Sequence, residues 1–175
     1  NDITKCNNGS MIYSCLLTPQ GKFLADFFIF NLEAGYFFET DKKFYKNLLT
    51  RLKIYKLRSD IQIEEVNNFY SYSIFNIDYE YDYTIQLNDP RNSNLGKKLI
   101  LNNKIKISDN NIETISEIEY HEILIANTTP YSPFDILENK SLLLENNFDN
   151  LNAIDWDKGC YVGQEITARM KYRGL

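Results

Sequence analysis

The fold is decided by residues 11–31, MIYSCLLTPQGKFLADFFIFN, in which two apolar runs flank a short polar segment. Both runs are rich in aromatic and β-branched residues, which favour strands. Pro19 and Gly21 lie between the runs, and Pro followed two positions later by Gly is typical of a tight turn. We therefore predict an antiparallel hairpin with strands at 11–18 and 23–31.

A single acid, Asp26, interrupts the second apolar run of this hairpin. Because side chains alternate along a strand, Asp26 shares a face with Leu24 and Phe28. Burying a charge is costly unless it is paired, so this carboxylate either faces solvent or projects into a polar pocket. The residues alone leave both interpretations open.

Strand and helix patterns continue along the rest of the chain. Residues 35–40, GYFFET, predict a third strand, and Asp41 is placed to cap a helix that runs to about Leu57. The apolar stripe of that helix comprises Phe44, Leu48, Leu52 and Tyr55. Further strands are predicted at 61–66, 68–77, 82–87 and 99–103, and a second helix at 112–126. We predict an α+β fold in which antiparallel sheets are covered by helices.

Residues 157–165, DKGCYVGQE, place a thiol between two glycines. Gly159 and Gly163 permit tight turns and close approach of a ligand or another backbone. A helix is predicted to begin at Gly163, so Cys160 precedes its N-terminus, where free N–H groups stabilise a thiolate. The alternative is a buried structural thiol, because free cysteine is among the most buried residue types.

Basic side chains surround this motif, although the chain is acidic overall with a formal net charge of -5. They are Lys158, Arg169, Lys171 and Arg173. The overall acidity argues against direct nucleic-acid binding through a broad basic face. The four cations are either ordinary surface residues or a strip that attracts a small polyanion. Glu165 lies four residues before Arg169, in the favourable order for an ion pair on a helix.

The composition is that of a globular protein, with 175 residues of which 43% are hydrophobic and 25% charged. This length suits one domain or two small lobes, at about 1–90 and 91–175. No apolar run has the length of a membrane span. Three cysteines at irregular spacing indicate a reducing compartment, and one histidine is too few for a structural zinc site, so we predict no metal.

Three other polar residues stand out. Asp89-Pro90-Arg91 interrupts the strand pattern, and we interpret it as a clamp whose guanidinium reaches a carboxylate or carbonyl. His121 is interpreted as a helix-surface or core residue. Glu145 follows three leucines, which predicts an acid at the end of a buried strand, either exposed or placed to accept two N–H donors from a planar heterocycle.

The segment Lys158-Gly159-Cys160-Tyr161-Val162-Gly163-Gln164-Glu165 resembles the signature K-G-C-Y-x-G-Q-E of the folate-binding YgfZ family, which is related to the T-protein of the glycine cleavage system. Three further segments are similar to elements of that family: Asn1-Asp2, Leu17 to Lys22 with Asp26, and Asp89-Pro90-Arg91 with Leu95-Gly96. The similarity extends over essentially the whole chain. It implies a T-protein/YgfZ-like folate-binding fold that continues beyond this chain into a C-terminal β-barrel, so we expect the chain to be a fragment.

The resemblance implies tetrahydrofolate or a folate derivative as cofactor. Glu145 matches the T-protein glutamate that holds the pterin, and Cys160 and Asp26 match the reactive positions. The implied cofactor-binding residues are Glu145, Lys158, Gly159, Tyr161, Gly163, Gln164, Glu165 and Arg169.

The function implied is support of iron–sulfur cluster assembly or repair and of tRNA modification, with folate and iron–sulfur client or assembly proteins as partners. The alternative is an enzyme, a folate-dependent one-carbon transferase of the aminomethyltransferase type, although Ala25 stands where the T-protein has a second acid. A third interpretation is a binding module in which the motif is only a turn. We expect no membrane partner and a cytoplasmic location, or the mitochondrial matrix if the source is eukaryotic.

Overall fold

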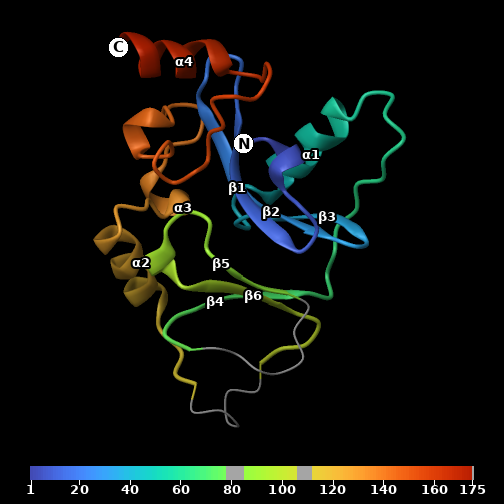
Figure 1. The fold of residues 1–175 in the computed structure, drawn as a ribbon, viewed down its shortest axis with the longest axis vertical. Helices are drawn as coiled ribbons and strands as arrows, with labels where there is room; N and C mark the ends of the chain where they lie inside the picture. Colours follow the sequence, from blue (N-terminus) through green and yellow to red (C-terminus); the bar gives the residue numbers. More distant parts are fainter. Residues whose placement is uncertain (78–84, 106–111, 175) are drawn as a thin grey trace.

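The computed structural model describes residues 1–77, 85–105 and 112–174 (Figure 1). Within these ranges it contains two three-stranded antiparallel sheets and four α-helices, joined by loops and short 3-10 turns. The α+β class is therefore as predicted. The division into two lobes and the continuation into a barrel stay predictions.

The first sheet contains the predicted hairpin and its third strand. Its strands are β1 (Ser10–Leu17), β2 (Phe23–Leu32) and β3 (Gly35–Glu39), in the order β1-β2-β3. Tyr13 lies opposite Phe28 and Cys15 opposite Asp26. The register shifts at Leu16/Leu17, which is a β-bulge next to the turn.

The second sheet has the order β4-β6-β5 and contains β4 (Tyr70–Ile74), β5 (Ile85–Asn88) and β6 (Lys97–Leu101). These strands confirm three of the predicted strand regions, although residues 82–84 lie outside the described residues. The strand predicted at 61–66 is wrong, since these residues form no strand and are mostly exposed. Alternation of polar and apolar residues is not enough for a strand when no neighbour is available to pair with it.

The helices differ from prediction mainly at their starts. Helix α1 (Tyr45–Tyr55) begins after Asp41, whose carboxylate instead accepts the N–H of Lys43 at 2.7 Å in a preceding turn. Helix α2 (Glu117–Ala126) begins later than predicted because Ser116 and Glu119 form a capping box. A short helix α3 (Ser132–Asp135) follows, and α4 (Gln164–Arg173) begins directly after Gly163, as predicted. Short 3-10 turns occupy Ile3–Lys5 (η1), Ser93–Leu95 (η2) and Leu144–Asn146 (η4).

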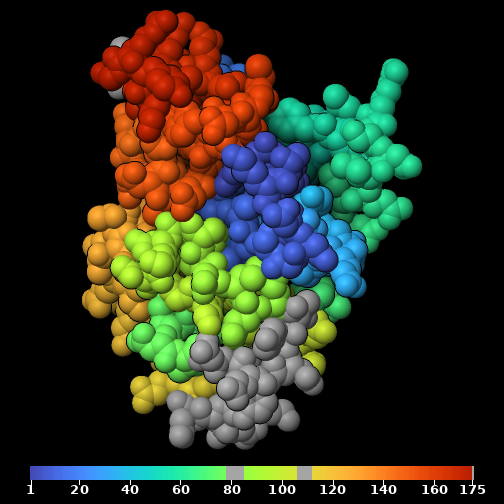
Figure 2. Space-filling model, viewed as in Figure 1, coloured from blue at the N-terminus to red at the C-terminus, as the bar shows by residue number. Residues whose placement is uncertain are grey.

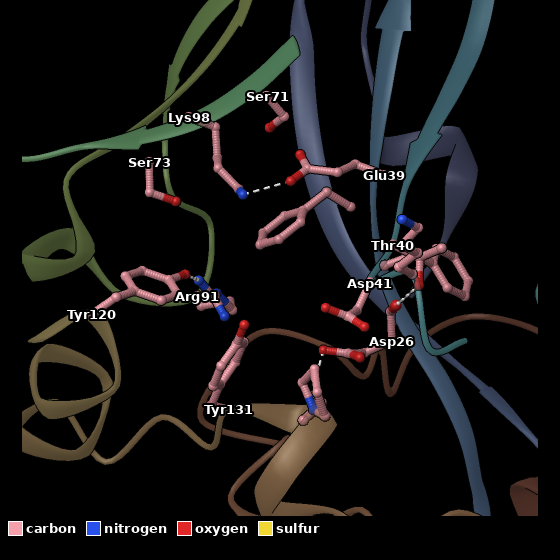
Figure 3. Close-up of a pocket in the computed structure, with 15 residues that line it drawn as sticks. Asp26, Glu39, Thr40, Asp41, Ser71, Ser73, Arg91, Lys98, Tyr120 and Tyr131 are labelled. Atoms are coloured by element: carbon pink, nitrogen blue, oxygen red, sulfur yellow. Dashed lines mark hydrogen bonds and ion pairs between the residues drawn. The ribbon is translucent and has the colours of Figure 1, made fainter. Parts of the chain in front are cut away.

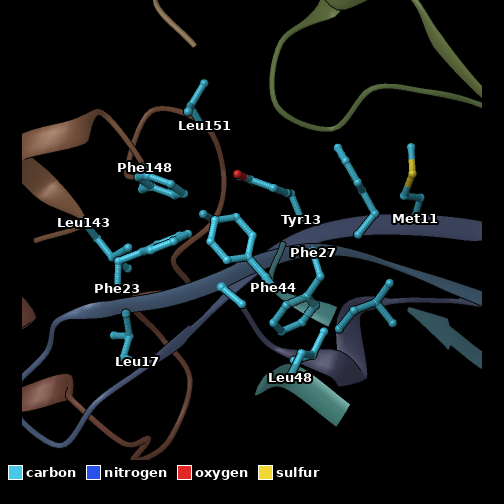
Figure 4. Close-up of a cluster of buried hydrophobic side chains, with 14 of the residues drawn as sticks. Met11, Tyr13, Leu17, Phe23, Phe27, Phe44, Leu48, Leu143, Phe148 and Leu151 are labelled. Atoms are coloured by element: carbon cyan, nitrogen blue, oxygen red, sulfur yellow. The ribbon is translucent and has the colours of Figure 1, made fainter. Parts of the chain in front are cut away.

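The main hydrophobic core lies between the first sheet, α1 and the segment 143–153 (Figure 4). The rings of Tyr13 and Phe23 both contact the ring of Phe148, and Phe23 packs edge-on against Phe44 of the turn before α1. Phe44 and Leu48 of the predicted stripe are buried, whereas Tyr55 is 45% exposed. Leu52 is partly buried and packs against the core, so the stripe belongs to the core as far as Leu52 and leaves it at Tyr55.

The strand predicted before Glu145 is wrong. Leu142 makes only an isolated bridge with Lys22, and the chain then turns into η4, which ends at Asn147 in the left-handed conformation. Leu143 still packs in the core, so the apolar run is buried without forming a ladder. Glu145 is exposed on this 3-10 turn.

The two ends of the long axis carry different parts of the chain. Helix α4 lies at one end and the β4-β6-β5 sheet at the other, with the first sheet between them (Figure 1). The space-filling view shows the segments 143–174 and 85–101 on either side of the N-terminal residues (Figure 2). The motif at 158–165, just before and at the start of α4, thus lies at the opposite end from the second sheet.

Candidate functional site

A cavity of about 300 Å³ lies where the first sheet faces the second sheet and the short helix α3 (Figure 3). The wall contributed by β2, β3 and the turn after β3 contains Asp26, Phe27, Phe28, Glu39, Thr40, Asp41 and Lys42. The opposite wall contains Ser71, Ser73, Arg91, Lys98, Tyr120, Tyr131, Ser132 and Pro133. The cavity therefore combines aromatic rings with several charged groups, which suits a polar aromatic ligand.

Asp26 projects into this cavity from β2, as the pocket interpretation of the sequence expects. Its Oδ2 accepts the hydroxyl of Tyr13 at 2.5 Å and the hydroxyl of Ser132 at 2.7 Å. Burial raises the pKa of the Asp26 carboxyl, and these two hydrogen bonds offset part of that rise. Both hydroxyls donate to Oδ2, so Oδ1 accepts from neither of them.

Two buried cations lie above the ring of Phe28. The guanidinium of Arg91 is 4.9 Å and the ammonium of Lys98 4.7 Å from the ring centroid. Arg91 donates to both carboxylate oxygens of Asp89, at 3.0 and 2.8 Å, which confirms the predicted clamp. Lys98 donates to Oε1 of Glu39 at 2.6 Å and so joins the two sheets across the cavity.

Each of these cations has its own acid. Burial lowers the pKa of Arg91, but the hydrogen-bonded ion pair with Asp89 outweighs this effect and raises it. Burial likewise opposes the charge of Lys98, and Glu39 raises the pKa of its ammonium above the usual value. Among the described residues no ion pair reaches Asp26, and its Oδ1 accepts from neither Tyr13 nor Ser132, so this oxygen is available to a ligand.

The structure explains why the second glycine of the motif, Gly163, is a glycine. Gly163 has φ 85°, and a Cβ at this position would lie 2.7 Å from the carbonyl oxygen of Thr18 and 3.0 Å from Cα of Gly21. The start of α4 therefore packs directly on the turn of the β1–β2 hairpin. Gly159 has open space around its Cα and no positive φ, so neither packing nor backbone geometry requires a glycine there.

Cys160 lies between these glycines and is exposed, while Cys6 is buried and Cys15 partly buried. Next to Cys160, Tyr161 packs against the main core and its backbone N–H donates to Oε1 of Gln164 at 3.3 Å. The motif thus holds its own loop in place and presents the sulfur to solvent. This excludes the interpretation of Cys160 as a buried structural thiol.

Partners are found for Lys158, Arg169 and Lys171 of the basic side chains around the motif. Lys158 donates to the carbonyl of Asn1 at 2.6 Å, and Lys171 pairs with Asp149 at 2.5 Å. Arg169 pairs with Glu165 at 2.5 Å, as the spacing predicts. These contacts favour ordinary surface ion pairs over a strip of cations aimed at one polyanion.

Of the predicted site residues, Asp26 lines the cavity and the others do not. Glu145 is exposed on η4, and the predicted residues of the segment 158–169 surround the start of α4. Their roles in cofactor binding stay predictions. His121 lies on α2 with Nε2 3.1 Å from Asp135, so the structure does not bring it to Cys160.

Sequence reasoning missed most of the cavity. Tyr13 and Ser132, which hold Asp26, come from β1 and from α3, 106 residues further along the chain than Asp26. The register of the hairpin contains a signal for Tyr13, because Tyr13 faces Phe28 on the same side as Asp26. Ser132 and Lys98 have no comparable local signal.

No family model matches the chain. The comparison with curated proteins, however, finds relatives with a common name. The chain is similar to mitochondrial iron–sulfur cluster assembly factors. It is 30% identical over 178 residues to the IBA57 homolog of Mycosarcoma maydis, which covers 95% of this chain and 44% of that protein.

Two other relatives carry the same description. The chain is 32% identical over 154 residues to the IBA57 homolog of Dictyostelium discoideum, covering 78% of this chain and 38% of that protein. It is 24% identical over 179 residues to the human factor IBA57, and the alignment covers 93% of this chain and 50% of that protein. The chain thus spans about half or less of the length of these curated relatives.

None of the described helices has both the length and the apolar composition needed to cross a bilayer. In the ranges 1–77, 85–105 and 112–174, no group of three or more His, Cys, Asp and Glu side chains is arranged to hold a metal ion.

Proposed function

We propose that this chain is the folate-binding part of an iron–sulfur cluster assembly factor of the YgfZ-related family, with a reduced folate in the Asp26 cavity and Cys160 as an exposed reactive group. The proposal unites three observations. The relatives named as mitochondrial iron–sulfur cluster assembly factors match nearly the whole chain, the motif at 158–165 resembles the YgfZ signature, and the cavity offers a carboxylate among aromatic rings.

The observation that carries the folate assignment is the partly satisfied Asp26 carboxylate. A pterin presents a row of ring and amino N–H groups, and a carboxylate is well suited to accept them. Tyr13 and Ser132 fix Asp26 through Oδ2 and leave Oδ1 for such a donor. Phe28 and Tyr131 supply the flat apolar surface against which a heterocycle packs.

The residues of the cavity therefore fit the ligand class that the family resemblance implies. In this proposal Asp26 binds and orients the pterin, and its raised pKa lets the carboxyl gain or lose a proton beside the ligand. When bound, the folate supplies the one-carbon and redox chemistry of the reduced pterin. The role of Glu145 as a further pterin ligand stays part of the proposal, to be tested separately because that side chain is exposed.

Cys160 supplies the second half of the proposal. Its sulfur is exposed and stands next to a loop that Gly163 and Gln164 hold in place. An exposed thiol on an ordered loop is available to the thiols, clusters or metal sites of another protein. One cysteine cannot hold a cluster alone, so this role requires a partner that contributes further ligands.

The same relatives support a proposal for the cellular location and the partners of this protein. Their printed names place them in mitochondria, and we propose the mitochondrial matrix for this protein, with iron–sulfur client or assembly proteins as partners. Support of radical enzymes that modify tRNA is a finer form of the same proposal. A direct contact with nucleic acid is not part of it.

A second candidate function is aminomethyl or methyl transfer with folate. The observation that favours it is the raised pKa of Asp26, because a carboxyl of this kind can exchange a proton with a reacting amine. The discriminating result is turnover of an amine donor in the presence of tetrahydrofolate, which the assembly role does not require.

The assembly role is tested in cells that lack the endogenous protein and receive the full-length protein, either unchanged or with Cys160→Ser. We expect Cys160→Ser to lower the activity of iron–sulfur enzymes to the level of the depleted cells while the folate affinity of the purified variant is unchanged. Val162→Ala serves as the matched control, since Val162 is a partly exposed neighbour on the same loop. Full rescue by Cys160→Ser would contradict the role assigned to the sulfur.

A further inference from the structure

Glu39 has an unsatisfied oxygen in the wall of the cavity. Its Oε1 accepts the ammonium of Lys98, whereas Oε2 is enclosed and accepts no hydrogen bond from the residues that the structure describes. A buried acceptor without a donor is costly and rare, so this oxygen in the cavity wall is a candidate contact for a ligand. Figure 3 shows this carboxylate between the two sheets, next to Lys98 and Ser71.

The position of Glu39 relative to Asp26 follows from the register of the first sheet. Glu39 lies directly opposite Phe28, and Asp26 lies two residues before Phe28 on the same face. Asp26 and Glu39 are therefore diagonal neighbours on adjacent strands, and the backbones of such residues are about 7–8 Å apart. Both acids line the same cavity wall, so one flat ligand in the cavity can reach both of them.

Lys98 determines which oxygen of the Glu39 carboxylate is left for a ligand. Its ammonium pairs with Oε1 of Glu39 and stands over Phe28, so the remaining capacity of the Glu39 carboxylate is for a further donor. The terminal torsion of a glutamate is broad, so a small rotation that keeps Oε1 near Lys98 can turn Oε2 towards a bound group. A ligand atom that carries only a lone pair next to Oε2 would instead be repelled, because both atoms are hydrogen-bond acceptors.

We infer that Glu39 selects the reduced form of the pterin, by accepting an N–H of the reduced ring from a ligand that Asp26 holds at its other edge. This inference rests on the proposed binding of folate in the Asp26 cavity. A tetrahydropterin carries hydrogen on both ring nitrogens of its reduced half, N5 and N8. In oxidised folic acid the same two nitrogens carry only lone pairs.

The test compares the affinities of the full-length protein for tetrahydrofolate and for folic acid by calorimetry in oxygen-free buffer. Wild-type protein is expected to prefer tetrahydrofolate by at least about tenfold, the effect of leaving one buried polar group unpaired. Glu39→Gln keeps an oxygen for Lys98, and this contact turns the amide N–H₂ group towards the ligand. The variant is therefore expected to lose the preference for tetrahydrofolate or to reverse it.

Glu138→Gln is the matched control, because Glu138 is also partly buried, accepts one amide at 2.6 Å and lies outside the cavity. It is expected to retain the wild-type ratio of affinities. A wild-type ratio in Glu39→Gln, with both folates still bound, would overturn the inference and leave the proposed function intact. Failure of wild-type protein to bind either folate would instead overturn the proposed function. Thermal unfolding of each variant confirms that the ratios refer to folded protein.

Discussion

Gly163 and Gly21 lie in direct contact, so that the start of α4 rests on the turn of the β1–β2 hairpin. A side chain at Gly163 would meet the carbonyl oxygen of Thr18 at 2.7 Å, and one at Gly21 would meet the carbonyl oxygen of Gly163 at 3.1 Å. The two glycines are 142 positions apart in the sequence, and they join the motif to the strands that carry Asp26. Of the two glycines on either side of Cys160, Gly163 is therefore explained by packing alone.

Gly163→Ala is expected to lower the free energy of unfolding by about 2–5 kcal/mol, because it combines a left-handed backbone penalty with a clash against rigid backbone. Gly159→Ala, four residues earlier on the same loop, is expected to change it by less than about 0.5 kcal/mol, because the space around Gly159 is open. Urea unfolding of both variants measures the difference. Equal losses at the two positions would show that this contact does not hold the loop.

The Asp26 carboxyl makes stability depend on pH. Its pKa is raised by burial, so the folded state binds the proton more tightly than the unfolded state. The contribution of Asp26 is therefore most favourable below the unfolded pKa of 3.8 and is lost as the pH rises through the folded pKa. We expect the stability of Asp26→Asn relative to wild type to increase over this window and then level off. A difference that does not vary with pH in urea unfolding would contradict the assignment.

The buried pair of Arg91 and Asp89 anchors the loop that precedes β6. Asp89→Ala leaves the guanidinium buried without its carboxylate, and we expect a loss of about 3–5 kcal/mol in the free energy of unfolding. Glu165→Ala removes an exposed pair with Arg169 and should cost less than about 0.5 kcal/mol. Similar effects of the two substitutions on chemical unfolding would argue against a special role for the clamp.

The three cysteines should differ in reactivity in the folded protein. Cys160 is exposed, Cys6 is buried, and burial raises the pKa of the Cys15 thiol well above its usual value. A thiol-specific chromogenic reagent is therefore expected to modify one cysteine rapidly, and Cys160→Ser should remove that fast phase. Persistence of the fast phase in Cys160→Ser would place the reactive sulfur elsewhere.

Sequence patterns predicted the parts of the fold that depend on neighbouring residues in the chain. The hairpin, the third strand and the start of α4 follow from turn residues and periodicity, and the structure confirms them. The strands at 61–66 and before Glu145 had the same patterns but found no partner to pair with. Pairing depends on distant segments, which periodicity does not encode.

The site was less predictable for a related reason. Counting back from the Leu17–Phe23 pair would place Cys15 opposite Ala25, but the bulge at Leu16/Leu17 shifts the register and places it opposite Asp26. The partners of Asp26 and Phe28 from the second half of the chain, Ser132 and Lys98, meet them only after the sheets pack together. The carboxylate itself could be identified from the sequence, but its surroundings could not.

The central claim is that Asp26 holds a reduced folate, and titration of the full-length protein with tetrahydrofolate in oxygen-free buffer tests it most directly. The account predicts saturable binding to wild-type protein and at least about tenfold weaker binding to Asp26→Ala, since the variant loses the acceptor of a charge-assisted hydrogen bond. Asp60→Ala, a change at an exposed aspartate outside the cavity, should bind as wild type does. Equal affinities of wild type and a folded Asp26→Ala, or no binding to either protein, would contradict the account.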